Sequence, residues 1–209
     1  MHPDSPVYLL GHGAGALIAI VMMKELKFNF SGMILISVAL KKPASSKALS
    51  AISDVALKMM PNKTGLFQPN YTMNVKNPNA TQFLVKDKLI HHDKVMVGSL
   101  MQMQNFMKKN EESSWKKLET PPILIVQGQY DKGADPINSI RFYESIKTKD
   151  KEYFWVPTMW NFFLLEEEYP QVESRIIQWL EVRSWWYRHK FHNLLIKWDI
   201  DNTIRFQDY

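Results

Sequence analysis

The residues with the clearest potential for chemistry lie at the start of the chain. Residues 7–10, VYLL, form an apolar run that suits a buried strand, residues 16–23 suit a buried helix, and the turn GHGAG at residues 11–15 joins them. A strand, a tight turn and a buried helix form the frame of a nucleophile elbow, whose central serine attacks a carbonyl carbon. Gly13 stands at that centre here. The frame is therefore present without its nucleophile.

The glycines also have a plainer interpretation. Small residues let a strand and a helix approach closely, and the central residue of a sharp turn is strained unless it is glycine. A phosphate-binding loop needs GxxxxGK[ST], and no lysine with a neighbouring hydroxyl residue follows Gly15. On these residues alone, the elbow and the ordinary turn remain equally open.

A second candidate for chemistry is Asp131. It follows the apolar run PPILIV at residues 121–126 and a break at Gly128. If the run is a strand, Asp131 lies just past its carboxyl end, where open α/β sheets place their functional groups. Asp135, four residues later and directly before Pro136, is expected to cap a helix instead.

The histidines give no metal pair. His91 and His92 are adjacent, and neighbouring residues on a helix point about 100° apart. We expect the side chain of His12 to pack beneath the glycine turn. No cluster with metal-ligand spacing is visible in the sequence, so we expect neither a metal nor another cofactor.

The elements that would position these residues alternate between strand and helix. We expect strands at residues 6–10, 32–37, 121–126 and 152–156, and helices at residues 14–26, from 135 onward and at 171–186. Their short connections imply right-handed parallel crossovers, and apolar runs without alternation imply a sheet covered on both faces. The predicted fold class is α/β, a mostly parallel sheet flanked by helices.

The block at residues 41–115 interrupts this alternation. Helical apolar spacing marks residues 44–60 and 83–107, with a polar, turn-rich stretch between them. We therefore predict a helical cap inserted beside the sheet. Methionines recur at positions 96, 101, 103 and 107, and we favour a helix packed on the core over contact with a ligand.

Composition limits the class of protein. The 209 residues are 45% hydrophobic, include no cysteine and carry a formal charge of +5. No apolar run is long enough to span a bilayer and no signal peptide is visible, so we expect a cytoplasmic protein. Aromatic and basic residues interleave in the tail at 181–209. A packed helix is the favoured interpretation of this tail, followed by a membrane-surface helix, with single-stranded nucleic acid last.

Taken in order, these stretches resemble the α/β-hydrolase family, and within it the monoglyceride lipase and lysophospholipase branch of serine aminopeptidase S33 type. GHGAGA at residues 11–16 corresponds to GHSMGG there, GMILIS at 32–37 to GMVLIS, and PPILIVQGQYD at 121–131 to PFLLLQGSAD. The resemblance implies that residues 1–180 form the C-terminal part of an α/β-hydrolase domain, with the cap at about 41–115 and the tail following.

The resemblance also implies roles for individual positions. Gly13 stands at the position of the nucleophile, Asp131 at that of the acid, and Asn161 at that of the histidine, within the loop TMWNFFLLE at 158–166. The backbone amide of Ala14 corresponds to one oxyanion donor. A second donor comes, in the family, from residues before the elbow strand. We expect a hydrogen bond between Asp131 and Asn161 to remain where the acid would hold the histidine.

The triad needs all three roles, because serine attacks, histidine carries the proton and aspartate orients the histidine. Our first hypothesis is therefore a non-catalytic protein that binds monoacylglycerol or another acyl lipid, or serves in interactions. An active lipase or esterase that uses other groups is the second, and a decayed partial gene product is the third. We further expect peripheral membrane contact, and self-association through residues 7–10, because the family flanks the elbow strand with a strand that this chain does not contain.

Overall fold

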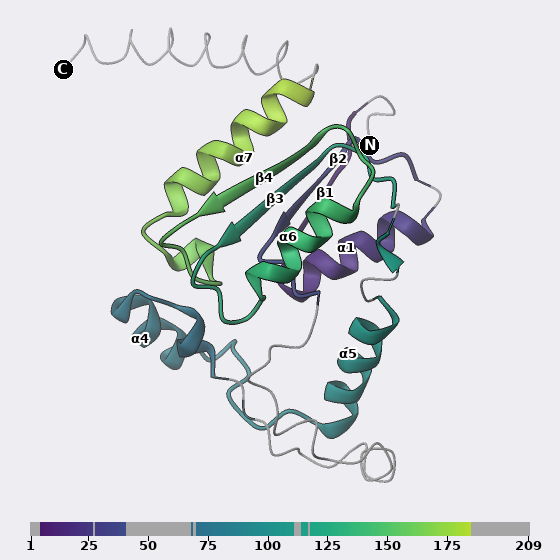
Figure 1. Ribbon diagram of the computed structural model, residues 1–209. Coiled ribbons are helices and arrows are strands. Elements are labelled where there is room, and N and C mark those ends of the chain that lie inside the picture. The colour runs from purple at the N-terminus through teal and green to yellow at the C-terminus, as the bar shows by residue number, and fades with distance from the viewer. Residues whose placement is uncertain are drawn as a thin grey trace, which may run out of the picture.

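The computed structural model describes residues 5–26, 28–40, 68, 70–110, 114–116 and 118–184. The expected helix at residues 44–60 and nearly all of the basic-aromatic tail lie outside this part of the chain. The described residues form a four-stranded sheet in the order β1-β2-β3-β4, in which every neighbouring pair is parallel (Figure 1). The strands are β1 (Tyr8–His12), β2 (Gly32–Ile36), β3 (Ile123–Gly128) and β4 (Lys151–Val156).

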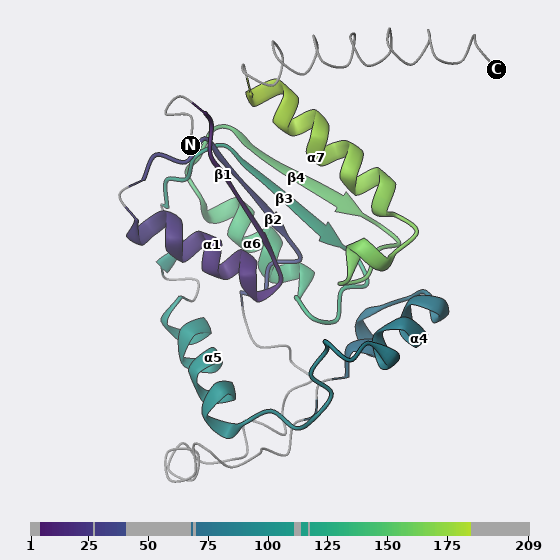
Figure 2. The same cartoon turned by 180° about the vertical axis from the view of Figure 1, so that it is seen from behind.

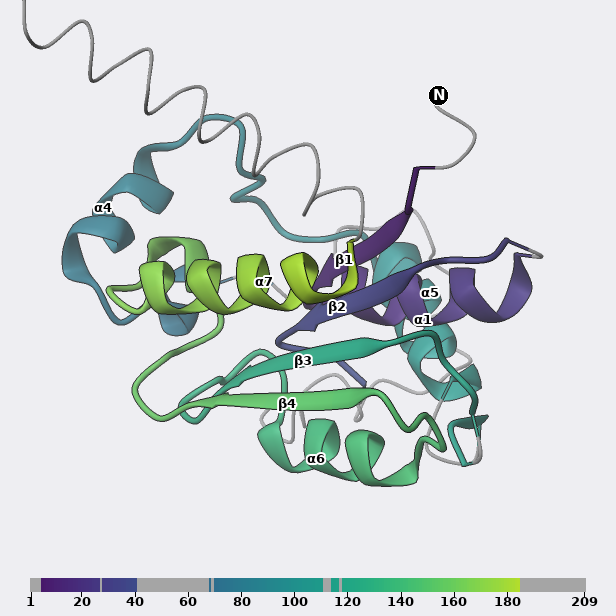
Figure 3. The same ribbon diagram turned by 90° about the horizontal axis from the view of Figure 1, so that it is seen from above.

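Helices cover both faces of the sheet, as the uninterrupted apolar runs predict. Helices α1 (Ala14–Glu25) and α6 (Pro136–Ser145) pack on one face, and α7 (Tyr169–Arg183) packs on the other (Figure 3). The two central strands are buried at every position. The predicted parallel α/β fold with flanking helices is therefore confirmed.

Local chemistry explains where the elements begin and end. Gly11 must lack a side chain, because a Cβ there would lie 2.5 Å from the carbonyl oxygen of Gly15. Gly32 leaves room for the ring of Trp179, which brings α7 down onto β1 and β2. The side chain of Asp135 accepts a hydrogen bond from the amide of Ile137 at 3.0 Å, so the predicted helix cap is confirmed.

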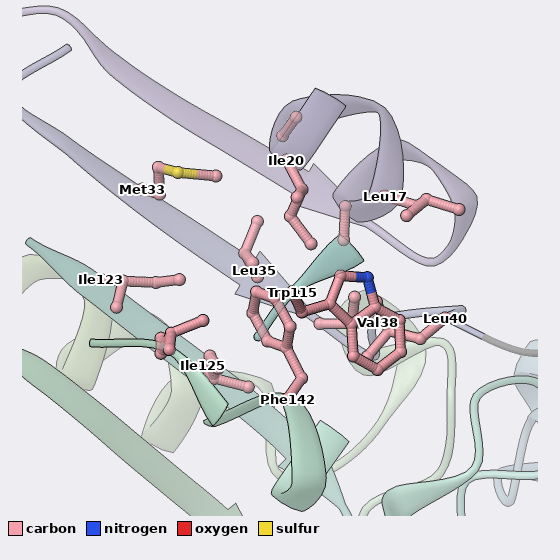
Figure 4. Packing of buried hydrophobic residues seen from close by; sticks show 13 residues of the cluster. Leu17, Ile20, Met33, Leu35, Val38, Leu40, Trp115, Ile123, Ile125 and Phe142 are labelled. Atoms are coloured by element: carbon pink, nitrogen blue, oxygen red, sulfur yellow. The ribbon is translucent and has the colours of Figure 1, made fainter. Parts of the chain in front are cut away.

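The larger core lies between the sheet and the α1–α6 face (Figure 4). Leu17 and Ile20 of α1 pack there with Trp115 and Phe142, whose rings meet edge to face at 5.5 Å. The indole nitrogen of Trp115 donates to the carbonyl of Asn110 at 2.7 Å. Burial of each such side chain is worth about 1.5–3 kcal/mol, so Trp115 anchors the end of the cap to the core.

The cap differs from the prediction. In place of one helical stretch at 83–107 the chain forms α4 (Pro78–Lys86) and α5 (Val97–Lys109), preceded by the 3-10 turn η2 (Tyr71–Asn74). The carboxylate of Asp87 ends α4 because it accepts from the amide of Leu89 at 2.9 Å and turns the chain. The other boundaries shift by a few residues from those expected.

The methionines in and next to α5 do not all pack on the core, contrary to the prediction. Met107 packs against the core together with Phe106, as expected for a packed helix. Met96 and Met103 are instead 51% and 39% exposed, and no residue of α5 is fully buried. The prediction that the methionines pack on the core therefore holds for Met107 but not for Met96 and Met103.

Candidate functional site

The turn between β1 and α1 has the geometry of a sharp elbow. Gly13 has φ 59° and ψ −122°, a backbone conformation that residues with a side chain rarely adopt. Its amide donates to the carbonyl of Ile36 at 3.0 Å, and its own carbonyl accepts from Ala16 and Ala39 at 3.2 Å. A Cβ placed on Gly13 would meet no atom within 4 Å. The centre of the turn thus faces open space and presents no reactive group to it.

Asp131 and Asn161 meet at the same end of the sheet. The side-chain amide of Asn161 donates to Oδ1 of Asp131 at 2.9 Å, and both residues are buried. This is the hydrogen bond expected from the sequence. Gly128 and Gly133 make the approach feasible, because a Cβ on Gly133 would lie 2.9 Å from the Asn161 side chain and one on Gly128 would lie 2.3 Å from the Met159 carbonyl oxygen.

The carboxylate of Asp131 is surrounded by donors. Oδ1 also accepts from the amides of Gly133 and Ala134 at 2.8 Å, and Oδ2 accepts from the side chain of Gln127 at 3.0 Å. All four partners are neutral amides. They hold the carboxyl group in place, but a side-chain amide is too weak a base and too weak an acid to transfer a proton at neutral pH.

His12 connects the elbow to the loop that carries Asn161. Its Nε2 lies 2.8 Å from the backbone oxygen of Asn161, and its ring packs against Phe162 and Phe163 with centroids 6.0 and 5.7 Å away. The ring is thus used for packing at the turn, as predicted. Through this contact Gly13, Asp131 and Asn161 are gathered at the carboxyl ends of β1, β3 and β4.

Ser37 belongs to the same cluster, and the sequence did not single it out. It is fully buried, has a φ of 52°, and its hydroxyl lies 3.5 Å from the same backbone oxygen of Asn161. A serine after an apolar strand is common, and the left-handed backbone that marks this one has no local sequence signal.

Ala14 begins α1, so its amide lies at the positive end of the helix next to Gly13.

The same loop is tied to the start of the cap. The amide of Lys76 donates to Oε1 of Glu166 at 3.0 Å, and the amide of Phe162 donates to the carbonyl of Asn74 at 3.2 Å. Burial raises the pKa of Glu166, the Lys76 amide opposes this shift, and the nearby charge of Glu168 adds to it. Glu166 is thus a buried carboxyl group at this junction, beside the ion pair between Lys76 and Glu168.

An apolar groove opens between α1 and α5. Its volume is about 610 Å³, within the range of small-molecule pockets. Ile18, one turn beyond Ala14 on α1, forms one wall. The other wall consists of residues from α5 and the position before it, namely Met96, Gly98, Ser99, Gln102, Met103 and Phe106. Met103 of α5 and Met96, the residue before it, therefore line a shallow, open apolar groove beside α1.

Two further properties bear on function. Within the described residues, no group of three or more His, Cys, Asp or Glu side chains is placed to hold a metal ion. Across the same part of the chain, no helix combines the length and the apolar character that crossing a bilayer would need.

The sequence model of the serine aminopeptidase S33 family matches residues 1–168. The chain belongs to this family of α/β-hydrolases. Monoglyceride lipase of Rattus norvegicus is 28% identical over 185 residues, covering 88% of this chain and 59% of the rat protein. The Homo sapiens monoglyceride lipase is 26% identical over 185 residues with the same coverage. The chain therefore spans about three-fifths of the length of these relatives.

Solved structures agree on the fold. A monoacylglycerol lipase of Paleococcus ferrophilus has a TM-score of 0.71 at 22% identity, over 86% of this chain and 70% of that one. A soluble variant of monoglyceride lipase from Saccharomyces cerevisiae, in complex with a substrate analogue, has a TM-score of 0.73 at 20% identity, over 86% and 62%. The described part of this S33-family chain is accordingly a partial α/β-hydrolase fold.

Proposed function

We propose that this chain is a non-catalytic, monoglyceride-lipase-like α/β-hydrolase that binds an acyl lipid. The observation that carries the proposal is that the centre of the turn has no side chain while the side-chain amide of Asn161 binds the carboxylate of Asp131. Gly13 offers no nucleophile, and Asn161 occupies the Oδ1 of Asp131 that would otherwise orient a histidine. Both assignments rest on the positions that the family resemblance gives to these residues.

A chain that lacks both the nucleophile and the general base cannot transfer an acyl group. Without a hydroxyl at position 13 no covalent intermediate forms, and without an imidazole at position 161 no group takes the proton. Members of such a triad act as a unit, and losing one lowers the rate by about four to six orders of magnitude. His12 does not replace the base, because its Nε2 is held by the backbone oxygen of Asn161.

The groove between α1 and α5 supports lipid binding. Its lining is mostly aliphatic, methionine and phenylalanine side chains, with Ser99 and Gln102 as the polar groups. A shallow apolar groove with a few polar groups offers a surface along which an acyl chain with a small polar head can lie. Methionine side chains adapt to flexible apolar ligands, so Met96 and Met103 fit this role.

Two measurements test the proposal. The 209-residue chain should not hydrolyse monoacylglycerol or p-nitrophenyl esters above background, and a fluorophosphonate probe should not label it. Calorimetry with a hexadecyl glycerol ether, which no esterase cleaves, should show saturable binding below its micellar concentration. Ester turnover would instead support an active enzyme that uses other groups.

A matched pair of variants locates the binding. Met103→Glu places a carboxylate in the groove and should weaken ether binding by at least about tenfold, because a charge is costly to bury in an apolar cleft. Val85→Glu, on the exposed surface of α4, should bind as the wild type does. Equal binding by both variants would exclude the groove, and a wild-type chain that binds no ether would exclude the lipid ligand.

A further inference from the structure

Two hydrogen bonds fasten the start of the cap to the loop between β4 and α7. The amide of Phe162 donates to the carbonyl of Asn74 at 3.2 Å, and the amide of Lys76 donates to Oε1 of Glu166 at 3.0 Å. Figure 2 shows α4, which follows this part of the cap, beside the same loop. Because the loop also carries Asn161, the junction joins the cap to the candidate site.

The carboxyl group of Glu166 is buried at this junction. Glu166 directly follows the 3-10 turn η4 (Phe163–Leu165) and is 5% exposed. Its Oε1 accepts from the amide of Lys76, whereas its Oε2 is buried and has no hydrogen-bond partner among the described residues. A carboxylate that is buried without donors at both oxygens loses hydration that nothing replaces, and a neutral carboxyl group largely avoids this cost. The surroundings of Glu166 therefore suit its protonated form.

The charged groups that face Glu166 add to this preference. The ammonium of Lys76 lies 3.4 Å from Oε1 of Glu168 and pairs with that carboxylate. Glu167 and Glu168 both place negative charge near Glu166. Tyr169, the first residue of α7, meets Glu166 through its backbone amide, which donates to the backbone carbonyl at 3.1 Å. A negative charge on Glu166 would therefore add to two others, with the neighbouring ammonium already paired.

We propose that protonation of Glu166 keeps the cap fastened to this loop and that its ionisation releases the cap. With the carboxyl group protonated, the neutral side chain stays buried and both hydrogen bonds of the junction persist. When the proton leaves, the carboxylate regains its hydration only if the loop separates from residues 74–76, so ionisation favours the open junction. The sheet stays intact, because both bonds join residues that lie outside the strands.

The pH range of the release follows from the two states of the junction. In the open state Glu166 is hydrated, so its pKa is that of an ordinary glutamate, about 4.3. In the closed state burial raises the pKa of the same group. The closed junction therefore has its full stability below the ordinary value and loses stability as the pH rises through the raised one.

Amide hydrogen exchange of the 209-residue chain, resolved by NMR at pH 4.5 and pH 7.5, tests the release. Protection factors correct for the intrinsic exchange rate at each pH. Those of the Lys76 and Phe162 amides should fall at least about threefold at the higher pH, because each reports the open junction. The internal control is the amide of Ile137, which bonds at 3.0 Å to the exposed carboxylate of Asp135 and should keep its protection factor.

Two variants assign the change to one carboxyl group. Glu166→Gln keeps an acceptor for the Lys76 amide but cannot ionise, so its junction amides should be protected equally at both pH values. Glu167→Gln removes the exposed neighbouring carboxylate and should retain the fall seen in the wild type. Equal protection at both pH values in the wild type overturns the proposal. So does a fall that persists in Glu166→Gln, or a fall of the same size at Ile137, since the change would then not be local to the junction.

Discussion

At the scale of single residues, the chemistry of this site is decided by which atoms each side chain brings to the end of the sheet. Asp131 keeps its carboxylate, and four amides hold it. Asn161 can donate to that carboxylate as an imidazole would, but it cannot then carry a proton. Gly13 keeps the strained backbone of an elbow without a hydroxyl to expose. The turn and the acid thus keep a close arrangement at this end of the sheet with a glycine and an amide at the two other positions.

Restoring the two missing groups should not restore activity in this chain. We expect the double variant Gly13→Ser with Asn161→His to hydrolyse p-nitrophenyl butyrate less than a hundredfold above background. By the family resemblance, the amide of Ala14 corresponds to one oxyanion donor and residues before the elbow strand provide the other, and lacking one donor costs about 10²–10³ in rate. The reaction is followed as absorbance of p-nitrophenolate, with the wild type as control. Turnover above that limit would show that a single donor suffices.

At the scale of the elements, close backbone contacts position the loop that carries Asn161. The carboxyl end of β3 lies directly against residues 159 and 160, with no room for a side chain at Gly128. The same loop bonds to the start of the cap through Asn74 and Lys76. The site therefore depends on two contacts between segments that are distant in sequence.

Gly128→Ala should destabilise the fold by about 1–3 kcal/mol, because the added methyl group meets the backbone of Met159 and not a flexible side chain. The matched control is Gly15→Ala, where an added Cβ meets no atom within 4 Å and alanine favours the helix. Urea denaturation followed by tryptophan fluorescence measures both. Equal free energies of unfolding for the two variants would contradict the close approach at Gly128.

At the scale of the whole molecule, stability should depend on the ionisation of Glu166. Its pKa is raised in the folded state, so the folded protein binds a proton more tightly than the unfolded chain does. The charged form is then the destabilising one. This contribution to stability is present at low pH and is lost as the pH rises through the folded pKa.

Glu166→Gln should therefore raise the melting temperature at pH 8 by a few degrees, and the difference from the wild type should shrink toward pH 4. Glutamine keeps an acceptor for the amide of Lys76 and removes the charge. Glu144→Gln, on an exposed position of α6, is the control and should change the melting temperature little at either pH. A wild type that is more stable than Glu166→Gln at pH 8 would show that the charge is favourable.

The sequence alone determined the order of the strands and helices, the parallel sheet and the frame around Gly13. These features depend on local patterns, since continuous apolar runs mark buried strands and glycines mark the sharp turn. The hydrogen bond between Asp131 and Asn161 was expected only from the family resemblance, which places these residues at the positions of the acid and the histidine.

Other features of the cap and of the site were decided only by the tertiary structure. The break between α4 and α5 begins at Asp87, whose carboxylate accepts a hydrogen bond from the amide of Leu89, a contact that periodicity does not reveal. The strain at Ser37, the groove beside α5 and the raised pKa of Glu166 each arise where segments far apart in sequence meet. Burial and contact between distant segments are properties of the folded chain, so no local pattern carries them.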